Sequence, residues 1–342
     1  MKMKVDGNVC HDLLRDKMQP KLAFSKDKDF AEWKKQLQAK LFELVGIDSV
    51  RNNACPLAFE IEKEEQKDGY KRIRFTIEPE VGSVLPVYVL IPDTGKEKYP
   101  VALVLQGHSS GFHNSIAEPK NEAEAEYALG RGAFAVQAVK RGYIAVAIEQ
   151  RGMGERRANR PMREGAQMCA YEALTAFALG RTLLGERMWD VSKVIDVLGN
   201  FPQCDLDKIF ITGSSGGGTM SFYAACFDER IKMSAPSCAF CSYKTSILDI
   251  FHCACNYIPH MAEWFEMEDL TALIAPRKFI VIAGKKDEIF PIHGVRAAFE
   301  TTQEIFAEAG CVENCRLVET EKAHWFCEDV VWDAIGAWIN EL

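Results

Sequence analysis

The distribution of hydrophobic residues along the chain changes near Val101. Before this point, residues 57–61, 72–77 and 85–91 have the pattern of short strands, and their alternation and close spacing predict antiparallel pairing. After it, continuous apolar runs predict buried strands. These runs occupy residues 101–106, 144–149, 208–212, 278–283 and 316–319.

Helical segments separate the apolar runs. They comprise residues 121–141, a long stretch that ends near residue 198, and residues 219–227, 295–309 and 330–339. Buried strands that alternate with helices form a parallel sheet whose two faces the helices cover. The sequence therefore predicts an α/β fold with a mixed, mostly parallel, eight-stranded sheet and helices on both faces.

The start of the chain predicts a helical extension of this sheet. Residues 27–45 are expected to form an amphipathic helix because apolar side chains recur there at helical spacing. Its apolar positions are Phe30, Trp33, Leu37, Leu41 and Leu44. No internal repeat or low-complexity linker divides the chain, so we expect a single domain, residues 1–342, with the extension at residues 1–55. Residues 236–270, between the sixth and seventh strands, are expected to cover a pocket.

Composition narrows the class of protein. The chain has 342 residues, of which 48% are hydrophobic, enough for a large core. A net charge of −8 without a long basic run argues against nucleic acid or an anionic membrane as a partner. No segment resembles a secretory signal or approaches the roughly 18 apolar residues of a membrane helix. Twelve cysteines in such a chain are typical of reduced thiols, so we expect a cytoplasmic protein.

Two segments match G-x-S-x-G, the pattern of a nucleophilic serine in a strand–turn–helix elbow. They are GHSSG at residues 107–111 and GSSGG at residues 213–217. The elbow needs a strand before the serine, a helix directly after it and small residues two positions to either side. The second match meets all three conditions with Ser215. Ser214 is a weaker candidate, because Thr212 stands two residues before it.

The first match has the strand but lacks the helix. Residues 111–121, GFHNSIAEPKN, have the composition of a loop. Too little parallel structure lies upstream for Ser109 to end a central strand. We therefore predict that Ser215 is the nucleophile. The alternative is a glycine-rich turn at residues 213–217 that only packs a helix on a strand.

In hydrolases with this elbow, an acid and then a histidine follow the serine in the chain. Asp287 stands just past the apolar strand 278–283, and its neighbour Glu288 is farther from the strand end. Of the seven histidines, only His293 and His324 follow Asp287, and His293 is too near in sequence to reach back. The sequence therefore predicts Asp287 as the acid and His324 as the base. The alternative is that Asp287 is an acidic residue in a turn, exposed to solvent and without a catalytic role.

Two backbone N–H groups are predicted to form the oxyanion hole. One follows the nucleophile, at Gly216, and the other comes from the loop after residues 101–106, where His108 is the best candidate. The alternative is that the His108 side chain is an ordinary polar group of a loop. Trp325 and Trp264 are candidates for an apolar wall beside the acyl group of a substrate.

A segment rich in cysteine and histidine raises the question of a metal. Its residues are Cys238, Cys241, His252, Cys253 and Cys255. Their spacing matches no standard zinc finger, and free cysteines are commonly small buried hydrophobic residues. We therefore expect neither a metal nor a cofactor, and the sequence assigns this segment no role beyond lining the pocket.

Five arginines follow the strand at residues 144–149. They are Arg151, Arg156, Arg157, Arg160 and Arg163. One hypothesis is that they attract an anionic substrate. Because Glu155 and Glu164 stand among them, a solvated loop is the favoured interpretation.

These residues together resemble α/β-hydrolases near the acetyl-xylan esterases and cephalosporin-C deacetylases, from about Phe30 onward. The resemblance rests on YPVALVLQGH (99–108), EQRGMG (149–154), residues 213–218 and APRKFIVIAGKKDEIFP (275–291). HCACNYIP (252–259) is also similar to a segment of relatives in this group. The resemblance implies the α/β-hydrolase fold and the hydrolysis of short acyl esters.

The chain departs from these deacetylases at three places. They usually have His-Gly-Tyr where Gln106-Gly107-His108 stands, and Gln where Gly216 stands. An Asp commonly precedes their Arg-Gly pair, and Glu149-Gln150 replaces it here. These departures bear on the alcohol part of the substrate.

The sequence thus predicts a serine ester hydrolase that acts on a small ester, with an acetylated carbohydrate among the candidates. A peptidase of the prolyl-oligopeptidase kind is one alternative, although about 95 residues before the parallel sheet cannot form the propeller that such enzymes carry. A non-catalytic binding protein on the same fold is the other. The sequence leaves the oligomeric state open and is compatible with a homo-oligomer.

Overall fold

The computed structural model describes residues 7–109, 111–159 and 169–342. Nine strands in this part of the chain form one sheet. They are β1 (Phe59–Lys67), β2 (Tyr70–Ile77), β3 (Leu85–Pro92), β4 (Tyr99–Leu105), β5 (Ile144–Ile148), β6 (Cys204–Ser214), β7 (Ile231–Ser237), β8 (Lys278–Gly284) and β9 (Cys315–Thr320).

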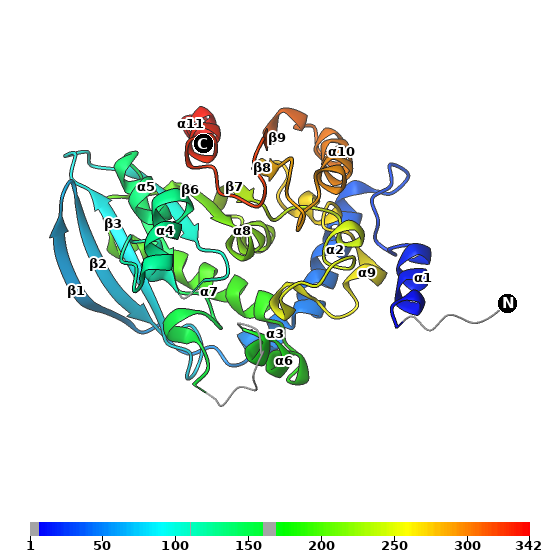
Figure 1. Ribbon diagram of the computed structural model, residues 1–342, viewed down its shortest axis with the longest axis horizontal. Helices are drawn as coiled ribbons and strands as arrows, with labels where there is room; N and C mark the ends of the chain where they lie inside the picture. The colour runs from blue at the N-terminus through cyan, green and yellow to red at the C-terminus, as the bar shows by residue number, and fades with distance from the viewer. Residues whose placement is uncertain (1–6, 110, 160–168) are drawn as a thin grey trace.

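The strands lie in the order β1-β2-β3-β5-β4-β6-β7-β8-β9. The pairs β1–β2, β2–β3 and β3–β5 are antiparallel. The five remaining pairs are parallel. The antiparallel strands form one end of the sheet in Figure 1. The predicted mixed, mostly parallel sheet with an antiparallel start is confirmed.

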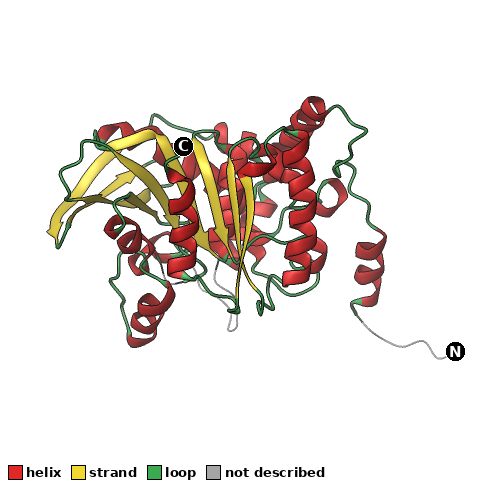
Figure 2. Cartoon of the chain, turned by 90° about the horizontal axis from the view of Figure 1, so that it is seen from above, coloured by secondary structure: helices red, strands yellow, loops and turns green. Residues whose placement is uncertain are grey.

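Helices cover both faces of this sheet, as Figure 2 shows. The α-helices of the described ranges are α1 (Val9–Lys17), α2 (Phe30–Val45), α3 (Ile47–Arg51), α4 (Glu122–Arg131), α5 (Phe134–Lys140), α6 (Ala170–Ala178), α7 (Leu183–Val197), α8 (Gly216–Phe227), α9 (Met261–Trp264), α10 (Ile292–Glu308) and α11 (Glu328–Ile339), of which α1 lies apart from the sheet (Figure 1, Figure 2). Within the described ranges, no helix has the length and hydropathy needed to cross a membrane.

The prediction of eight strands is wrong by one. The missing strand is β7, with the sequence IKMSAPS, which lies between β6 and β8 in the sheet. Its polar residues break the apolar run that identifies a buried strand. Ser234 is nevertheless fully buried, because its hydroxyl donates a 2.9 Å hydrogen bond to the carbonyl oxygen of Ser221 in α8.

The helix predicted at residues 121–141 is in fact two helices, α4 and α5. The break falls at Gly132 and Ala133, and Ala133 has a left-handed backbone with φ of +46°. Its N–H donates to the carbonyl oxygen of Asn114 at 2.9 Å instead of continuing the helix. The pattern of apolar residues runs through the break, so periodicity alone does not reveal it.

Successive side chains of the central strands point to opposite faces of the sheet, and a hydrophobic core lies on each face. In β4, Val101, Leu103 and Leu105 face a core shared with α2, α7, α8 and α10. Ala102 and Val104 face the opposite core, which α5 and α11 complete. A strand buried on both faces must be apolar at every position, which explains the continuous runs in the sequence.

The N-terminal segment contributes to the first core through α2. Trp33, Leu37, Leu41 and Val45 are buried along one side of this helix, as predicted for an amphipathic helix. By contrast, α1 has no buried residue. Its Arg15 binds Asp249 at 2.7 Å, in the long connection between β7 and β8.

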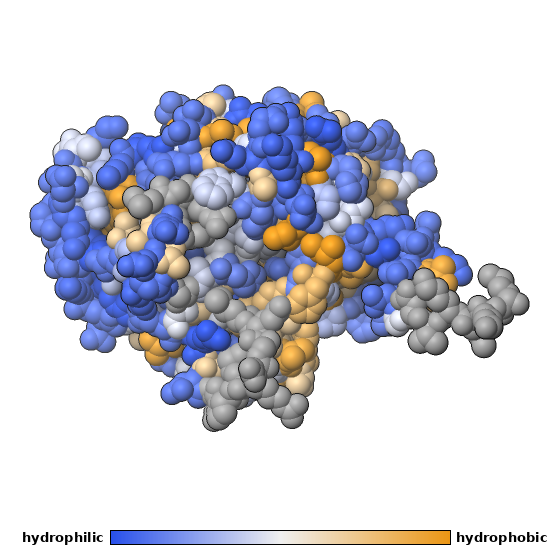
Figure 3. Space-filling view, viewed as in Figure 1, coloured by the Kyte–Doolittle hydropathy of each residue, from blue (hydrophilic) through white to orange (hydrophobic). Residues whose placement is uncertain are grey.

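Hydrophobic side chains also gather on the face seen in Figure 3, beside the grey atoms and near α6. The large apolar residues exposed in and after α6 and in the connection between β7 and β8 include Tyr171, Leu174, Leu179, Ile250 and Phe251. Phe251 is 76% exposed. An apolar surface therefore borders the segment that follows β7.

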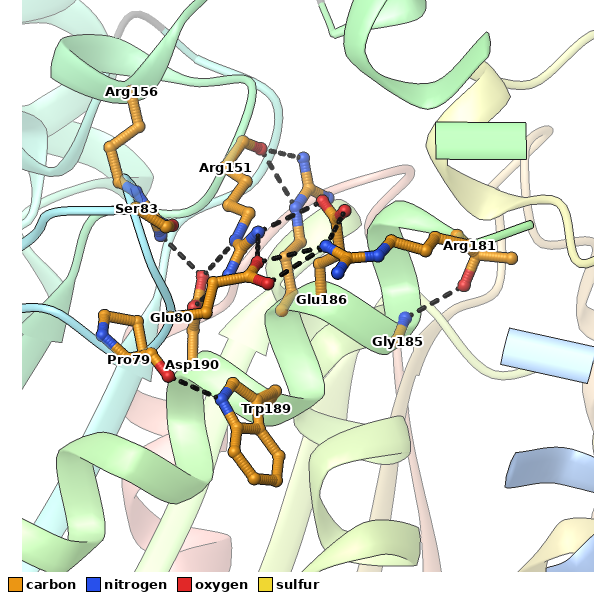
Figure 4. A network of polar contacts seen from close by, with 12 residues as sticks. Pro79, Glu80, Ser83, Arg151, Arg156, Arg181, Gly185, Glu186, Trp189 and Asp190 are labelled. Carbon is orange, nitrogen blue, oxygen red and sulfur yellow. Dashed lines mark hydrogen bonds and ion pairs between the residues drawn. The ribbon is translucent and has the colours of Figure 1, made fainter. Parts of the chain in front are cut away.

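A buried network of ion pairs joins α7 to the loops after β2 and β5 (Figure 4). Arg151 donates to the two carboxylate oxygens of Asp190 at 2.8 and 2.9 Å and also binds Glu80. Arg156 adds a 2.6 Å bond to Asp190, and Arg181 binds Glu80 at 3.0 Å. Burial opposes ionisation, but Arg151 and Arg156 outweigh it and keep the pKa of Asp190 below its usual value.

This network corrects the interpretation of the arginine cluster. Arg151 and Arg156 neither belong to a solvated loop nor offer a free charge to a substrate, because Asp190 and Glu80 neutralise them inside the fold. Arg157 is exposed. Arg160 and Arg163 lie outside the described residues.

We predict that Asp190→Ala destabilises the protein by about 3–5 kcal/mol, because two arginines lose their buried counter-charge. The midpoint of urea unfolding measures this effect. Glu64→Ala is the matched control, since it removes one acid of a half-exposed pair with Lys71, where the effect is small. Equal midpoints for the two variants would contradict the structural role of Asp190.

Candidate active site

Ser215 stands at the turn between β6 and α8. It has φ of +54° and ψ of −121°, a backbone conformation that non-glycine residues adopt at a cost and that is found at functional turns. Its N–H donates to the carbonyl oxygen of Ser237 at 3.0 Å, and its carbonyl accepts from Thr219 in the first turn of α8 at 2.8 Å. The strand and the helix expected on either side of this serine are both present.

The glycines on either side of Ser215 are required by close contact with β4. A β-carbon on Gly213 or on Gly217 would overlap the carbonyl oxygen of Leu105, at the end of β4. Any side chain at these two positions would push β6 and α8 away from the centre of the sheet. The physical reason for small residues at this elbow is therefore visible in the neighbouring strand.

Ser109, in the other G-x-S-x-G match, lies in a loop. The loop follows β4 and leads to a single 3-10 turn, Phe112–Asn114. The hydroxyl of Ser109 makes long contacts, of 3.5 and 3.4 Å, with the backbone carbonyl oxygen and N–H of Gly111. The expected absence of an elbow at Ser109 agrees with this geometry.

The loops after β8 and β9 bring Asp287 and His324 together. Nδ1 of His324 lies 2.8 Å from a carboxylate oxygen of Asp287. The other oxygen of Asp287 accepts the N–H groups of Ile289 and Phe290 at 2.8 and 3.1 Å. Burial opposes ionisation, but the contact with His324 and these backbone bonds keep the pKa of Asp287 below its usual value. The carboxylate is therefore charged and fixed in orientation.

The two rival residues lie elsewhere. Glu288 is exposed next to Asp287, and His293 is exposed in the first turn of α10. Backbone pairing continues past the ends of β8 and β9, because Lys285 N–H donates to Thr320 and Lys286 N–H donates to Lys322. This pairing is what carries residue 287 toward residue 324.

Three residues lie beside the histidine: Phe290, which the sequence analysis missed, and Cys238 and His252, which belong to the segment expected to line the pocket. The ring of Phe290 stacks on His324 at a centroid distance of 6.0 Å, and the His252 ring packs edge-on against Phe290 at 5.4 Å. The sulfur of Cys238 lies within 4.8 Å of the ligand atoms of Asp287 and His324. Nothing local in the sequence places these residues there, since they come from the connections after β7 and β8.

The loop after β4 lies against Ser215 and the start of α8. A β-carbon on Gly107 would stand 3.3 Å from Cβ of Ser215, and one on Gly216 would stand 2.8 Å from Cε1 of His108. The His108 ring therefore packs on the first residue of α8. Its Nε2 lies 3.0 Å from the sulfur of Cys255.

The sequence of the chain is similar to those of known proteins. A family model described as Abhydrolase family matches residues 4–234, more than half of the chain. The chain belongs to this α/β-hydrolase family. A protein of Bacillus subtilis (strain 168) named "Putative hydrolase YtaP" is 27% identical over 244 residues, which cover 70% of this chain and 78% of that protein.

Solved structures share the α/β-hydrolase fold. A Bacteroides fragilis protein described as a "putative acetyl xylan esterase" has a TM-score of 0.80 and 18% identity, over 98% of this chain and 95% of that chain. The glucuronoyl esterase from Solibacter usitatus has a TM-score of 0.67 and 14% identity, over 94% and 97%. At these identities the likeness concerns the fold, and the predicted fold class is confirmed.

Two of the places where this α/β-hydrolase departs from the deacetylase sequences, Gln106 and Glu149-Gln150, contact each other in the structure. The amide of Gln106 donates to Glu149 at 3.1 Å, and the amide of Gln150 donates to the Gln106 carbonyl oxygen at 2.7 Å. Glu149 also accepts the backbone N–H groups of Phe112 and Glu155. Residues that differ from the deacetylases at the ends of β4 and β5 thus form one network, which holds the loop that contains His108.

The two tryptophans are placed differently. Trp325 directly follows His324 and is 37% exposed. Trp264, at the end of α9, packs under the ammonium groups of Lys21 and Lys40 at 4.3 and 4.0 Å from its ring centroid. These contacts belong to the N-terminal segment and give no support to Trp264 as a wall beside the acyl group.

Two groups of side chains in the described ranges have the geometry to hold a metal. One is Cys238 with Asp287 and His324, where burial raises the pKa of the Cys238 thiol to about 12 and keeps it protonated. The other consists of His108, Cys169, Cys253 and Cys255.

We predict a pH-dependent stability from Glu149, which is fully buried. Burial raises its pKa to about 7, so the folded state binds a proton that the unfolded state releases near pH 4.5. Its contribution to stability therefore falls between about pH 4.5 and pH 7, by up to ~3 kcal/mol. Relative to wild type, Glu149→Gln should gain stability from pH 5 to pH 8 in thermal unfolding.

The exposed Glu60→Gln controls for the loss of one carboxylate. A difference between wild type and Glu149→Gln that is the same at pH 5 and pH 8 would rule out ionisation of Glu149 in this range.

Proposed function

We propose that the chain is a serine ester hydrolase that cleaves a small carboxylic ester through an acyl-enzyme. Ser215 is the nucleophile, His324 the general base and Asp287 the residue that orients His324. The observation that carries the proposal is the pairing of two features at the carboxyl ends of parallel strands. These are a serine at a strained strand–helix turn and a buried carboxylate 2.8 Å from an imidazole.

Acylation begins when Nε2 of His324 accepts the proton of Ser215 as its oxygen attacks the ester carbonyl carbon. The Asp287 carboxylate accepts a hydrogen bond from Nδ1–H of His324, which leaves Nε2 free to act as the base and stabilises the imidazolium once it forms. The backbone N–H groups of Gly216 and His108 donate to the oxyanion. These donors are fixed before reaction, which is why such holes accelerate acyl transfer.

The tetrahedral intermediate then collapses. The C–O bond to the alcohol breaks, and His324 returns its proton to the leaving oxygen. A water molecule, deprotonated by His324, attacks the acyl-enzyme in the second half of the cycle and releases the carboxylic acid. Each half transfers one proton to His324 and one proton away from it.

The proposed substrate carries an acetyl or short acyl group on a small alcohol, with carbohydrate esters as the leading class. This follows the names of similar structures, which include an acetyl xylan esterase from Paenibacillus sp. R4, of TM-score 0.60, 15% identity and 88% coverage of this chain. Phe290 and Trp325 beside His324 supply the apolar contacts that a short acyl group needs.

We predict that Ser215→Ala abolishes nearly all hydrolysis of p-nitrophenyl esters, by several orders of magnitude in kcat, because the attacking oxygen is lost. The assay uses esters of increasing acyl length, and we expect the acetyl and butyryl esters to be the best substrates. Thermal unfolding should show that Ser215→Ala remains folded, since a hydroxyl is the only group removed.

Ser109→Ala is the matched control, because Ser109 stands in the same sequence pattern but in a loop. It should retain hydrolysis within a few-fold of wild type. Loss of activity in Ser109→Ala with Ser215→Ala unaffected would reverse the assignment of the two serines.

A further inference from the structure

Four side chains from three distant parts of the chain meet beside the elbow. His108 follows β4, Cys169 precedes α6, and Cys253 and Cys255 lie in the connection between β7 and β8. One ligand atom from each, Nε2 or Nδ1 for the histidine and Sγ for the cysteines, lies within 4.8 Å of all the others. The shortest separations are 3.0 Å from His108 to Cys255 and 3.1 Å from Cys169 to Cys253.

The types of these residues match a zinc ligand set. Three thiolates and one imidazole around Zn²⁺ form a standard structural site, with Zn–S near 2.3 Å and Zn–N near 2.0–2.1 Å. Ligand atoms in such a tetrahedron are roughly 3.5–3.8 Å apart. The two shortest separations are below this spacing and the others are at most 4.8 Å, so a bound ion would need the ligand atoms to move by about an ångström or less.

Burial and charge around the cluster also suit a metal. Cys169 and Cys255 are 1% and 2% exposed. A zinc ion with three thiolates and a neutral imidazole carries one net negative charge. Arg187, a buried residue of α7, contacts Cys255 and Cys169 and places a positive charge beside the cluster. The side chain is held in place by bonds from Nε and Nη2 to the carbonyl oxygen of Arg151.

We propose that His108, Cys169, Cys253 and Cys255 form a structural zinc site. Four protein ligands complete the tetrahedron and leave no open position, so the ion serves to hold loops together rather than to bind substrate. Binding releases the protons of the three thiols. The ion joins the loop next to Ser215 to a segment 147 residues later in the sequence.

This inference replaces the expectation that the chain needs no metal. That expectation considered Cys238, Cys241 and His252 together with the C-x-C pair at 253 and 255. The structure divides these residues: Cys241 contacts Thr245 at 3.2 Å, and His252 contacts Ser246 at 3.2 Å. Only the C-x-C pair contributes, and its two other partners lie 84 and 147 residues away.

The test measures metal in the full-length chain, purified without a histidine tag or a chelator. Elemental analysis should find about one zinc per chain. Cys253→Ser and Cys169→Ser should lose it, because the serine hydroxyl does not replace a thiolate. Cys226→Ser is the matched control, since Cys226 is equally buried but outside the cluster and its bond to the Leu270 carbonyl oxygen suits a hydroxyl. It should keep its zinc.

A second measurement remains decisive if the serine variants fail to fold. Wild-type protein exchanged with Co²⁺ should show sulfur-to-cobalt charge-transfer absorption and the visible bands of a tetrahedral site. Removal of the ion by a chelator should lower the unfolding temperature of wild type. Three results would each overturn the proposal: no zinc even after incubation with ZnCl₂, a cobalt spectrum without charge-transfer bands, or a disulfide between Cys169 and Cys253 in the purified protein.

Discussion

The carbonyl oxygen of Leu105, at the end of β4, limits what can stand beside it in the centre of the sheet. A β-carbon at Gly213 or Gly217 would occupy the same space, so β6 and α8 approach β4 only through glycine. The chain must reverse from strand to helix between these two glycines, which gives Ser215 its positive φ. Backbone crowding thus places the serine at the turn between β6 and α8.

The remaining parts of the site depend on the same crowded centre. Because β4 pairs with β6, the loop after β4 comes to lie on the first turn of α8, where the His108 ring packs on Gly216. Glu149 and Gln150 at the end of β5 hold that loop from the other side through Gln106 and Phe112. Ser215, the loop after β4 and the cysteine cluster are therefore one packed unit.

Much of this arrangement could be predicted from sequence, because its signals are local. Glycine spacing and a strand–helix change identify Ser215, and the strand-end positions of Asp287 and His324 follow from apolar runs. The strand β7 was missed because Ser234 satisfies its hydroxyl by an internal hydrogen bond instead of being apolar. The break between α4 and α5 was missed because it depends on the backbone of Ala133.

Long-range contacts account for the rest. Arg151 and Arg156 have the sequence pattern of a basic surface loop, and only the fold shows Asp190 and Glu80 between them. The cluster of His108 with Cys255 joins residues that no spacing rule relates. Trp264 is an aromatic residue of the kind that often lines a pocket, but its ring packs against Lys40 of α2. In each case the partner is distant in the chain, so local patterns in the sequence could not identify it.

The central claim, that Ser215 is an activated nucleophile, is tested most directly by covalent labelling with a fluorophosphonate. Attack by an activated serine forms an O–P bond and releases fluoride, and peptide mass mapping identifies the modified residue. The account predicts one adduct per chain, at Ser215, and none in Ser215→Ala. An adduct at Ser109 or Ser214, or unlabelled protein that still hydrolyses esters, would contradict it.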